Sequence, residues 1–392
     1  MSELPNRYLR QMRLPGFGPE GQRRLRDARV LVAGCGALGT VVCEQLVRAG
    51  LGTLVVVDRD VVEPSNLQRQ TLFTEQDALR RTPKAEAAKS RLRQVNAECV
   101  VRALVDDLHA GNVLRHAQGC DLIVDCLDNF ETRYLLNDCA VELGVPLVYG
   151  GAVGMRGMAA GLLPATGAGR TEARVSYAAA HATACLRCIA PEPPPAGEVE
   201  TCDTVGVLAP AAAIAASIEA GIALRLLAEG AAAVPAALVR FDLATLAFSS
   251  ASLAGARDAA CPCCARGERR FLRAAVAPWR VLCGRNAVEL RLAEALDEGA
   301  LARIGRRLGV EVEPGARAVR GVINPASGVT DSARGVLDPA SGVIDSARGV
   351  IDSARGVAAL QVLCGESGAL VIVEGTTDPE RARAAVAALV GL

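Results

Sequence analysis

The chain has 392 residues, of which 51% are hydrophobic, and its 43 lysine and arginine residues balance 43 aspartate and glutamate residues. This length predicts about two domains with enough apolar residues for a large core. A formal net charge of zero argues against nucleic acid as the main partner. Fourteen cysteines in a chain this long favour a reduced, cytoplasmic protein with a zinc site over a disulfide-rich secreted scaffold.

The first predicted elements are a strand, a glycine-rich turn and a helix. Apolar residues 30–33 are typical of a buried strand, and a helix-like run ends near residue 49. Between them, Gly34, Gly36 and Gly39 allow a tight turn and a close approach of the backbone to a ligand. The N–H groups that begin the helix attract anions. The pattern therefore indicates a nucleotide site.

A second strand, at residues 53–57, ends at Asp58, which has the spacing of a ribose-binding carboxylate. The strand–turn–helix and this acid together are most often an NAD site. The loop that follows does not suit a redox cofactor, because Asn66, Gln68 and Arg69 supply amides and a guanidinium that matches phosphate oxygens. A solvated polar turn is the alternative for this loop.

Lysine is rare in this chain, since Lys84 and Lys89 are the only lysines among its 43 basic residues. Lys84 opens a predicted helix over residues 84–97, where a compact ammonium on a flexible stem can reach a phosphate. Lys89 lies on another face of that helix and is expected to face solvent. We therefore expect a functional role for Lys84.

A third strand, at residues 122–124, also leads into polar residues, as is typical of α/β ligand sites. Asp128 is a candidate Mg²⁺ ligand. Either Asp128 or Asn129 could instead cap the predicted helix over residues 130–143. Capping and metal binding are compatible if different residues perform them.

Two cysteine pairs share one spacing, Cys185 with Cys188 and Cys261 with Cys264. Four thiolates in this arrangement suit tetrahedral Zn²⁺ and leave no open position for catalysis. A redox motif or unliganded thiols are the alternatives. Cys263 is the spare thiol, and the register of the second pair could shift by one.

A lone cysteine, Cys202, follows a proline-rich loop. Most single cysteines pack in a core, but the neighbouring acids Glu198, Glu200 and Asp203 favour exposure. An exposed thiol could act as a nucleophile, although nearby acids disfavour its thiolate form. Packing and chemistry are therefore both open for Cys202.

The most apolar tract, residues 210–228, is predicted to be helical. Glu219 and Arg225 interrupt it, so we expect no membrane span. Residues 1–13 are polar and carry arginines, which predicts that no signal peptide is present.

Beyond residue 270 the sequence changes character and predicts a small α+β domain over residues 271–392. Helices are expected at 290–308 and 379–389, and strands at 310–312, 360–364 and 370–373. Inside it, an insertion over residues 321–357 contains five seven-residue copies, each with a glycine, an Asp or Asn, and small residues. They offer no a/d seam, so a flexible insertion is expected, with stacked turns as the alternative.

Over approximately residues 6–265 the chain resembles the ubiquitin-activating-like adenylyltransferases of the ThiF/MoeB/HesA group. The resemblance implies a Rossmann-like doubly wound, mainly parallel sheet with a zinc-bound second part, together forming a domain over residues 1–270. The matching elements, in order, are residues 7–11, the glycine turn, residues 58–60, residues 65–70, Pro83 with Lys84, residues 126–129, both cysteine pairs, and Thr201 with Cys202.

The resemblance further implies that the enzyme uses Mg·ATP to adenylylate the C-terminal Gly-Gly carboxylate of a ubiquitin-like sulfur-carrier protein, releasing pyrophosphate. It implies a homodimer in which Arg10 reaches the partner's site, and it permits a thioester or persulfide at Cys202. Arg69 and Lys84 would stabilise the triphosphate and Asp128 would bind Mg²⁺. The implied nucleotide-binding set is Gly34, Gly36, Gly39, Asp58, Asp60, Ser65, Asn66, Leu67, Gln68, Arg69, Lys84, Asp128 and Asn129.

Two other classes remain open. An NAD-dependent oxidoreductase would explain the glycine turn and Asp58, but it leaves Lys84 and the cysteine pairs unexplained. A non-catalytic nucleotide-binding scaffold of the same fold would bind ATP without turnover, and the presence of both Arg69 and Asp128 speaks against it.

Overall fold

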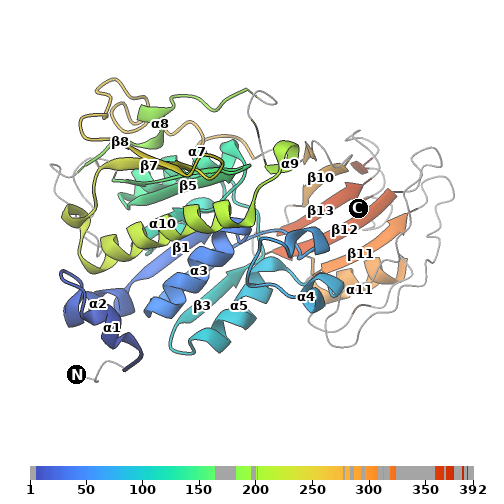
Figure 1. Ribbon diagram of the computed structural model, residues 1–392. Helices are drawn as coiled ribbons and strands as arrows, with labels where there is room; N and C mark the ends of the chain where they lie inside the picture. Colours follow the sequence, from blue (N-terminus) through green and yellow to red (C-terminus); the bar gives the residue numbers. More distant parts are fainter. Residues whose placement is uncertain are drawn as a thin grey trace.

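The computed structural model describes residues 6–163, 182–195, 200, 202–276, 279–282, 287–292, 296–307, 312, 318–323, 358–365, 368–374, 382–383 and 386. Its main body is an eight-stranded sheet in the order β3-β2-β1-β4-β5-β6-β7-β8 (Figure 1). The strands are β1 (Arg29–Ala33), β2 (Thr53–Val57), β3 (Val100–Leu104), β4 (Leu122–Asp125), β5 (Leu147–Val153), β6 (Arg156–Leu162), β7 (Ala237–Asp242) and β8 (Ala247–Ser252). Strands β1 to β5 are parallel and β6 to β8 continue antiparallel. The predicted mainly parallel α/β sheet is therefore confirmed.

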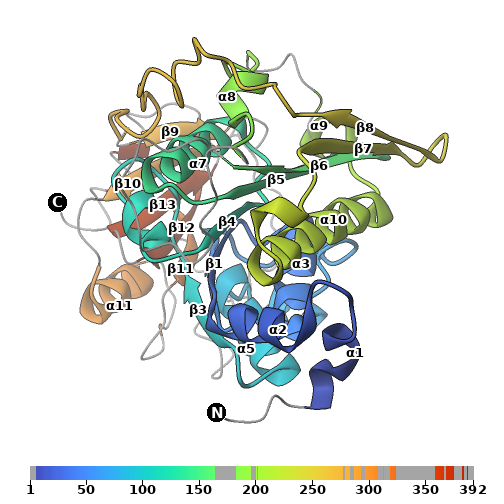
Figure 2. The ribbon, with the colours of Figure 1, turned by 90° about the vertical axis from the view of Figure 1, so that its left-hand side faces the viewer.

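Helices cover both faces of this sheet, because successive apolar residues of a strand point to opposite sides. Val30 and Val32 of β1 belong to one core cluster, whereas Leu31 and Ala33 belong to the other. Figure 2 shows α7 on the opposite side of β4 and β5 from α3 and α10. The helices are α1 (Leu9–Met12), α2 (Gly18–Asp27), α3 (Ala37–Ala49), α4 (Glu75–Leu79), α5 (Lys84–Val95), α6 (Val113–Ala117), α7 (Phe130–Leu143), α8 (Leu186–Ile189), α9 (Cys202–Val205) and α10 (Ala209–Ala228), with short 3-10 turns η1 (Asn6–Tyr8), η2 (Pro64–Asn66) and η4 (Ala231–Ala233).

Strands β1, β2 and β4 end side by side at the same edge of the sheet. Ala33 is paired with Val57 on one side and with Asp125 on the other. The strand order also reverses between β1 and β4, since β2 lies on one side of β1 and β4 on the other. Ligands of such sheets bind in the crevice beyond this switch point. We call the loops that follow these three strands, residues 34–36, 58–60 and 126–129, the nucleotide edge.

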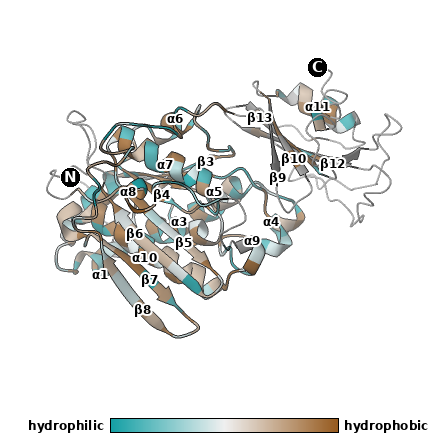
Figure 3. Ribbon diagram, turned by 90° about the horizontal axis from the view of Figure 1, so that it is seen from above, coloured by the Kyte–Doolittle hydropathy of each residue, from teal (hydrophilic) through white to brown (hydrophobic). Residues whose placement is uncertain are grey.

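Helix α10 is the only described helix that is long and apolar enough to cross a membrane. In the structure, 56% of its apolar window is buried, and it packs on β5, β6 and α3. Figure 3 shows α10 mostly in brown and white along its length. A buried core helix has this composition too, and α10 occupies that position here.

The tail contains a second, antiparallel sheet in the order β11-β12-β13-β10-β9, with its own apolar core. Its elements are β9 (Trp279–Leu282), β10 (Ala287–Leu292), α11 (Glu298–Arg307), β11 (Ala318–Ile323), β12 (Ala358–Gly365) and β13 (Gly368–Glu374). The strands predicted at 360–364 and 370–373 are confirmed. The division between residues 270 and 271 stays a prediction.

The helix predicted over residues 290–308 is wrong in its first part. Val288, Leu290 and Leu292 alternate with polar residues and face the core of the second sheet, so this segment forms β10. The helix α11 begins only at Glu298. Of the repeat, residues 324–357 lie outside the described residues. So do residues 310 and 311 of the predicted strand and most of the predicted last helix.

Candidate nucleotide site and cysteine cluster

The glycine turn is closed so tightly that two of its glycines cannot carry a side chain. Gly34 has φ +89°, and a Cβ there would lie 2.8 Å from the carbonyl oxygen of Cys126. A Cβ on Gly39 would lie 2.0 Å from the carbonyl oxygen of Gly34. At Gly36 the nearest atom would be Nε2 of Gln70, 3.9 Å away. Gly36 precedes α3 and gives it no side-chain cap, so the space in front of the helix suits an anion.

Asp58 joins the glycine turn to the next loop. Its Oδ2 accepts a hydrogen bond from the backbone N–H of Cys35 at 2.6 Å, and its Oδ1 accepts one from Asp60 at 2.7 Å. Burial raises the pKa of Asp58, and the nearby Lys84 ammonium partly offsets this effect. The carboxylate therefore shapes the nucleotide edge, and its expected bond to a ribose stays a prediction.

Lys84 is buried at the nucleotide edge and points toward acids. Its Nζ lies 2.9 Å from Oδ2 of Asp60, and its side chain is 8% exposed. Burial alone would lower the pKa of Lys84, but the carboxylates of Asp60, Asp58 and Asp128 outweigh it and raise the pKa. Lys89 instead pairs with Glu86 at 3.1 Å on the partly exposed face of α5. The ammonium of Lys84 is thus held at the nucleotide edge by Asp60.

The polar loop after β2 is ordered by its own side chains. Asn66 is buried, and its Oδ1 accepts a hydrogen bond from the N–H of Glu63 at 3.0 Å. Arg69 donates from Nη1 to the carbonyl of Ser65 at 2.9 Å. Ser65 and Gln68 are exposed, and Leu67 is partly buried in the main core. The loop is therefore a shaped turn with one partly exposed guanidinium rather than a solvated coil.

Gln70 was not selected as a site residue from the sequence. It is 4% exposed, and among the described residues its Oε1 has no hydrogen-bond partner. Its amide faces the open position at Gly36. A buried amide in front of a helix N-terminus is a candidate ligand group that only the fold reveals, because the sequence pattern of a polar loop does not distinguish it from its neighbours.

Of the two residues Asp128 and Asn129, it is Asn129 that takes the capping role. Asn129 caps α7, since its Oδ1 accepts a hydrogen bond from the N–H of Thr132 at 2.9 Å. The Asp128 carboxylate is exposed and makes no hydrogen bond to any described residue. It is close enough to Lys84 to raise the pKa of that lysine. Mg²⁺ commonly takes one or two carboxylates together with substrate phosphates, so this donor fits it.

Two of the predicted site residues, Arg10 and Cys202, do not lie among the residues of the nucleotide edge. Arg10 is exposed on α1, next to Gln11, whose Nε2 donates to the carbonyl of Ala49 at the last residue of α3. Arg10 is therefore near the far end of a helix that is about 20 Å long. Cys202 begins α9, which contacts β5 near its carboxyl end. The side chain of Cys202 lies outside the described residues.

The four predicted cysteines come together although 76 positions separate the two pairs. Their sulfur atoms all lie within 4.8 Å of one another, with 3.9 Å between Cys185 and Cys188, 3.7 Å between Cys185 and Cys261, and 3.4 Å between Cys188 and Cys264. A tetrahedral Zn²⁺ with bonds of about 2.3 Å needs sulfurs about 3.8 Å apart. The spacing thus fits zinc and is too long for a disulfide.

The spare thiol, Cys263, lies beside this cysteine cluster and hydrogen-bonds to α7. Its Sγ donates to Asp138 at 3.2 Å and accepts from Asn137 at 3.4 Å. Asn137 also accepts from the N–H of Leu186 at 2.8 Å, and Asp138 from that of Phe271 at 2.9 Å. Helix α7 therefore fixes both cysteine loops, and the register of the second pair is the predicted one.

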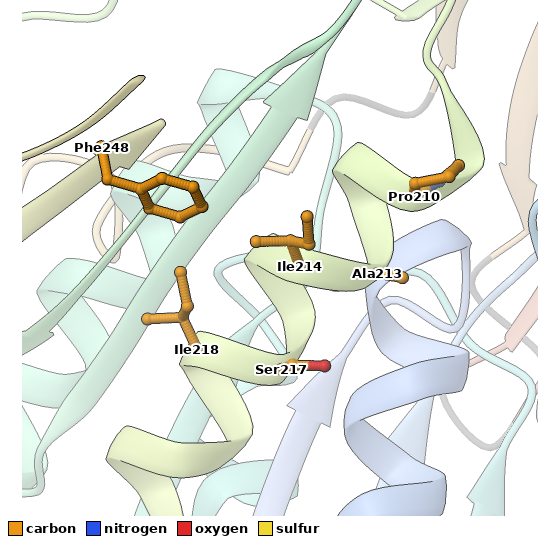
Figure 4. A pocket seen from close by; sticks show the side chains of 6 residues that line it. All are labelled: Pro210, Ala213, Ile214, Ser217, Ile218 and Phe248. Carbon is orange, nitrogen blue, oxygen red and sulfur yellow. The ribbon is translucent and has the colours of Figure 1, made fainter. Parts of the chain in front are cut away.

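A third feature is an open apolar hollow of about 450 Å³ between α10 and β8. Figure 4 shows that Ile214, Ile218 and Phe248 face it. Its lining residues are Pro210, Ala213, Ile214, Ser217, Ile218 and Phe248. Because no charged group lines it, the hollow is not a nucleotide site.

Residues 8–263 match the ThiF family. The chain is 39% identical over 317 residues to the sulfur carrier protein ThiS adenylyltransferase of Bacillus subtilis strain 168, covering 79% of this chain and 87% of that relative. It is 39% identical over 259 residues to the sulfur carrier protein adenylyltransferase of Thermus thermophilus, covering 66% and 90%. A solved structure of E. coli MccB with MccA-N7isoASN aligns with a TM-score of 0.54 at 21% identity, covering 67% of this chain and 75% of that chain. At that identity the structural likeness concerns the fold alone.

Proposed function

Because this chain belongs to the ThiF family, we propose that it uses ATP to adenylylate the C-terminal Gly-Gly carboxylate of a ubiquitin-like sulfur-carrier protein of the ThiS or MoaD type. Relatives at 39% identity are named for adenylyl transfer to a sulfur carrier, and the chain spans 87% and 90% of their lengths. The activated carrier would then accept sulfur in thiamine, molybdopterin or related biosynthesis.

In the proposed reaction an oxygen of the carrier carboxylate attacks the α-phosphorus of ATP. The bond between the α-phosphorus and the bridging oxygen breaks, and pyrophosphate leaves with that electron pair. The carboxylate is itself the nucleophile, so the protein needs to align two anions and to neutralise developing charge on the phosphates. It needs no general base for the attack.

The observation that supports this reaction most strongly is the gathering of two anion-binding groups and one candidate cation-binding carboxylate at the nucleotide edge. The uncapped N-terminus of α3, the buried ammonium of Lys84 and the exposed carboxylate of Asp128 come from three separate segments. Lys84 and Arg69 would bind the triphosphate, and Asp58 the ribose. Asn66 and Gln68 would line the phosphates, and Asp128 would hold Mg²⁺, whose charge offsets that of the leaving pyrophosphate.

Further parts of the proposal concern groups outside this edge. Zn²⁺ at the cysteine cluster would be structural, because four sulfurs leave no open coordination position. In a homodimer, Arg10 would serve the site of the partner subunit, which accords with its distance from the site in its own chain. Cys202 would be free for a thioester or persulfide, and we propose a cytoplasmic location. The similarity to the Bacillus subtilis relative extends into the tail, since 79% of this chain is more than residues 1–263 can supply.

Carrier-dependent exchange of pyrophosphate into ATP tests this function. We expect Arg69→Ala and Lys84→Ala to abolish exchange while the fold and the zinc content stay intact. Lys89→Ala is the matched control, since Lys89 pairs with Glu86 on the outside of the same helix. Near wild-type exchange in both site variants would show the assignment of these residues to be wrong. A change in nicotinamide absorbance with no exchange would favour an oxidoreductase instead.

A further inference from the structure

Behind the loop that carries Asp128 lies a cluster of ionisable side chains that the proposed reaction does not use. Asp125 ends β4, Arg133 lies in the second turn of α7, and Glu219 lies in the middle of α10. Asp125 and Glu219 are fully buried, and Arg133 is 7% exposed. Burying such groups is costly unless hydrogen bonds compensate, so their contacts indicate what they do.

Asp125 and Arg133 bind the two peptide groups that flank Leu127, one on each side of it. Asp125 Oδ1 accepts a hydrogen bond from the N–H of Leu127 at 3.1 Å. Arg133 Nη2 donates to the carbonyl of Leu127. Arg133 Nη1 donates to the carbonyl of Gly150 in β5 at 2.6 Å and lies 3.5 Å from Oδ2 of Asp125. Leu127 is thus held at both its N–H and its carbonyl, and the guanidinium ties it to β5.

Leu127 is the residue before Asp128. The Asp128 carboxylate has no hydrogen bond of its own to a described residue, and Asn129 on its other side is fixed as the cap of α7. The direction of the Asp128 side chain is therefore set by the backbone on either side of it. Arg133 also lies four residues after Asn129, so the capping residue and Arg133 lie on the same face of α7.

We propose that Arg133, acting with Asp125, is a positioning residue that fixes the Leu127 peptides and thereby aims the Asp128 carboxylate at the Mg²⁺ of bound ATP. The role of Asp128 itself rests on the proposed function. Arginine is required because it serves acceptors on Leu127, Gly150 and Asp125 at once with a rigid planar fork, which a lysine ammonium cannot do. The ring of Tyr149 lies 5.0 Å from the guanidinium carbon and closes this side of the cluster.

Glu219 makes no hydrogen bond to Arg133, Asp125 or Leu127. Its carboxyl oxygens have no hydrogen-bond partner among the described residues, and burial raises its pKa well above the ordinary value. The guanidinium of Arg133 bonds to Asp125, Leu127 and Gly150 and not to Glu219. Glu219→Gln keeps the size of the side chain and is a matched control from the same cluster.

The test is the binding of a non-hydrolysable ATP analogue to the full chain with and without Mg²⁺, measured by calorimetry. We expect Arg133→Lys to bind the metal-free analogue as the wild type does, but to lose roughly tenfold of the gain in affinity that Mg²⁺ provides. Carrier-dependent exchange should need correspondingly more Mg²⁺ for half-maximal rate. Glu219→Gln should match the wild type in both measurements.

The proposal would be overturned if Mg²⁺ raised the affinity for the analogue equally in Arg133→Lys and the wild type. It would also be overturned if Arg133→Lys lost affinity for the metal-free analogue to the same extent, because that loss indicates a merely structural role. If Arg133→Lys does not fold, Asp125→Asn decides, because it keeps the acceptor for Leu127 while removing the charge that faces Arg133. It should show a reduced Mg²⁺ gain, and an unchanged gain would contradict the proposal. If the wild type showed no exchange activity but the variants still differed from it in the Mg²⁺ gain, the proposed function would be rejected and the positioning role of Arg133 would stand.

Discussion

At the cysteine cluster four sulfur atoms already lie within 4.8 Å of one another, and α7 holds both of their loops. At the nucleotide edge the polar groups are spread over loops after three strands. Several of them are occupied with shaping those loops, such as Asp58 with Cys35 and Asn66 with Glu63. The cluster is preassembled and closed, as suits a structural metal. At the edge and the loop beside it, Asp128 is exposed and Arg69 is partly exposed, as suits a substrate that arrives and leaves.

This contrast predicts the largest effects for changes at the cluster. Cys261→Ser should lose the bound zinc and cost at least ~4 kcal/mol in free energy of unfolding, because structural metal binding contributes directly to folding. Cys263→Ser is the matched control, since Cys263 is not one of the four grouped sulfurs and bonds to Asn137 and Asp138 of α7. It should keep one zinc per chain and cost only ~1 kcal/mol. Metal analysis with urea unfolding measures both, and equal zinc loss in the two variants would contradict this arrangement.

The glycine turn should show a smaller effect that separates folding from binding. Gly39→Ala forces a methyl against the carbonyl of Gly34 and should cost ~2–3 kcal/mol in unfolding free energy. Gly36→Ala should leave stability within ~0.5 kcal/mol, because only Gln70 approaches that position. Its methyl would occupy the space in front of α3, so ATP affinity should fall roughly tenfold. Unchanged ATP affinity in Gly36→Ala would show that no phosphate of ATP lies at this position.

The last prediction concerns Glu219 and depends on pH. Burial raises the pKa of Glu219 in the folded protein, so the folded state keeps a proton that the unfolded chain releases above about pH 4.3. The wild type therefore loses stability as pH rises above that value, by at most ~1.4 kcal/mol per unit until the folded pKa is reached. Glu219→Gln removes this loss. Its advantage in urea unfolding should be absent near pH 4 and grow toward pH 7, and a constant advantage would disprove this explanation.

The same contrast explains what the sequence could predict. Gly34, Gly36 and Gly39 have a fixed spacing after an apolar strand, and the cysteine pairs repeat one spacing, so local pattern was enough to identify both features. The strands β1, β2 and β4 were predicted for the same reason. The contacts of Arg133, Glu219 and Gln70 depend on strands and helices that meet only in the fold, and no local pattern identifies them. The helix predicted at residue 290 failed because Val288, Leu290 and Leu292 follow a strand period.

The most direct measurement is the intact mass of a Gly-Gly-ending sulfur-carrier protein incubated with this enzyme and Mg·ATP. We predict that the carrier gains the mass of one adenylyl group, that pyrophosphate appears in step with it, and that a carrier lacking its last two glycines is unchanged. A carrier that binds the enzyme and ATP together but never gains that mass would contradict the assignment of this chain as an adenylyltransferase.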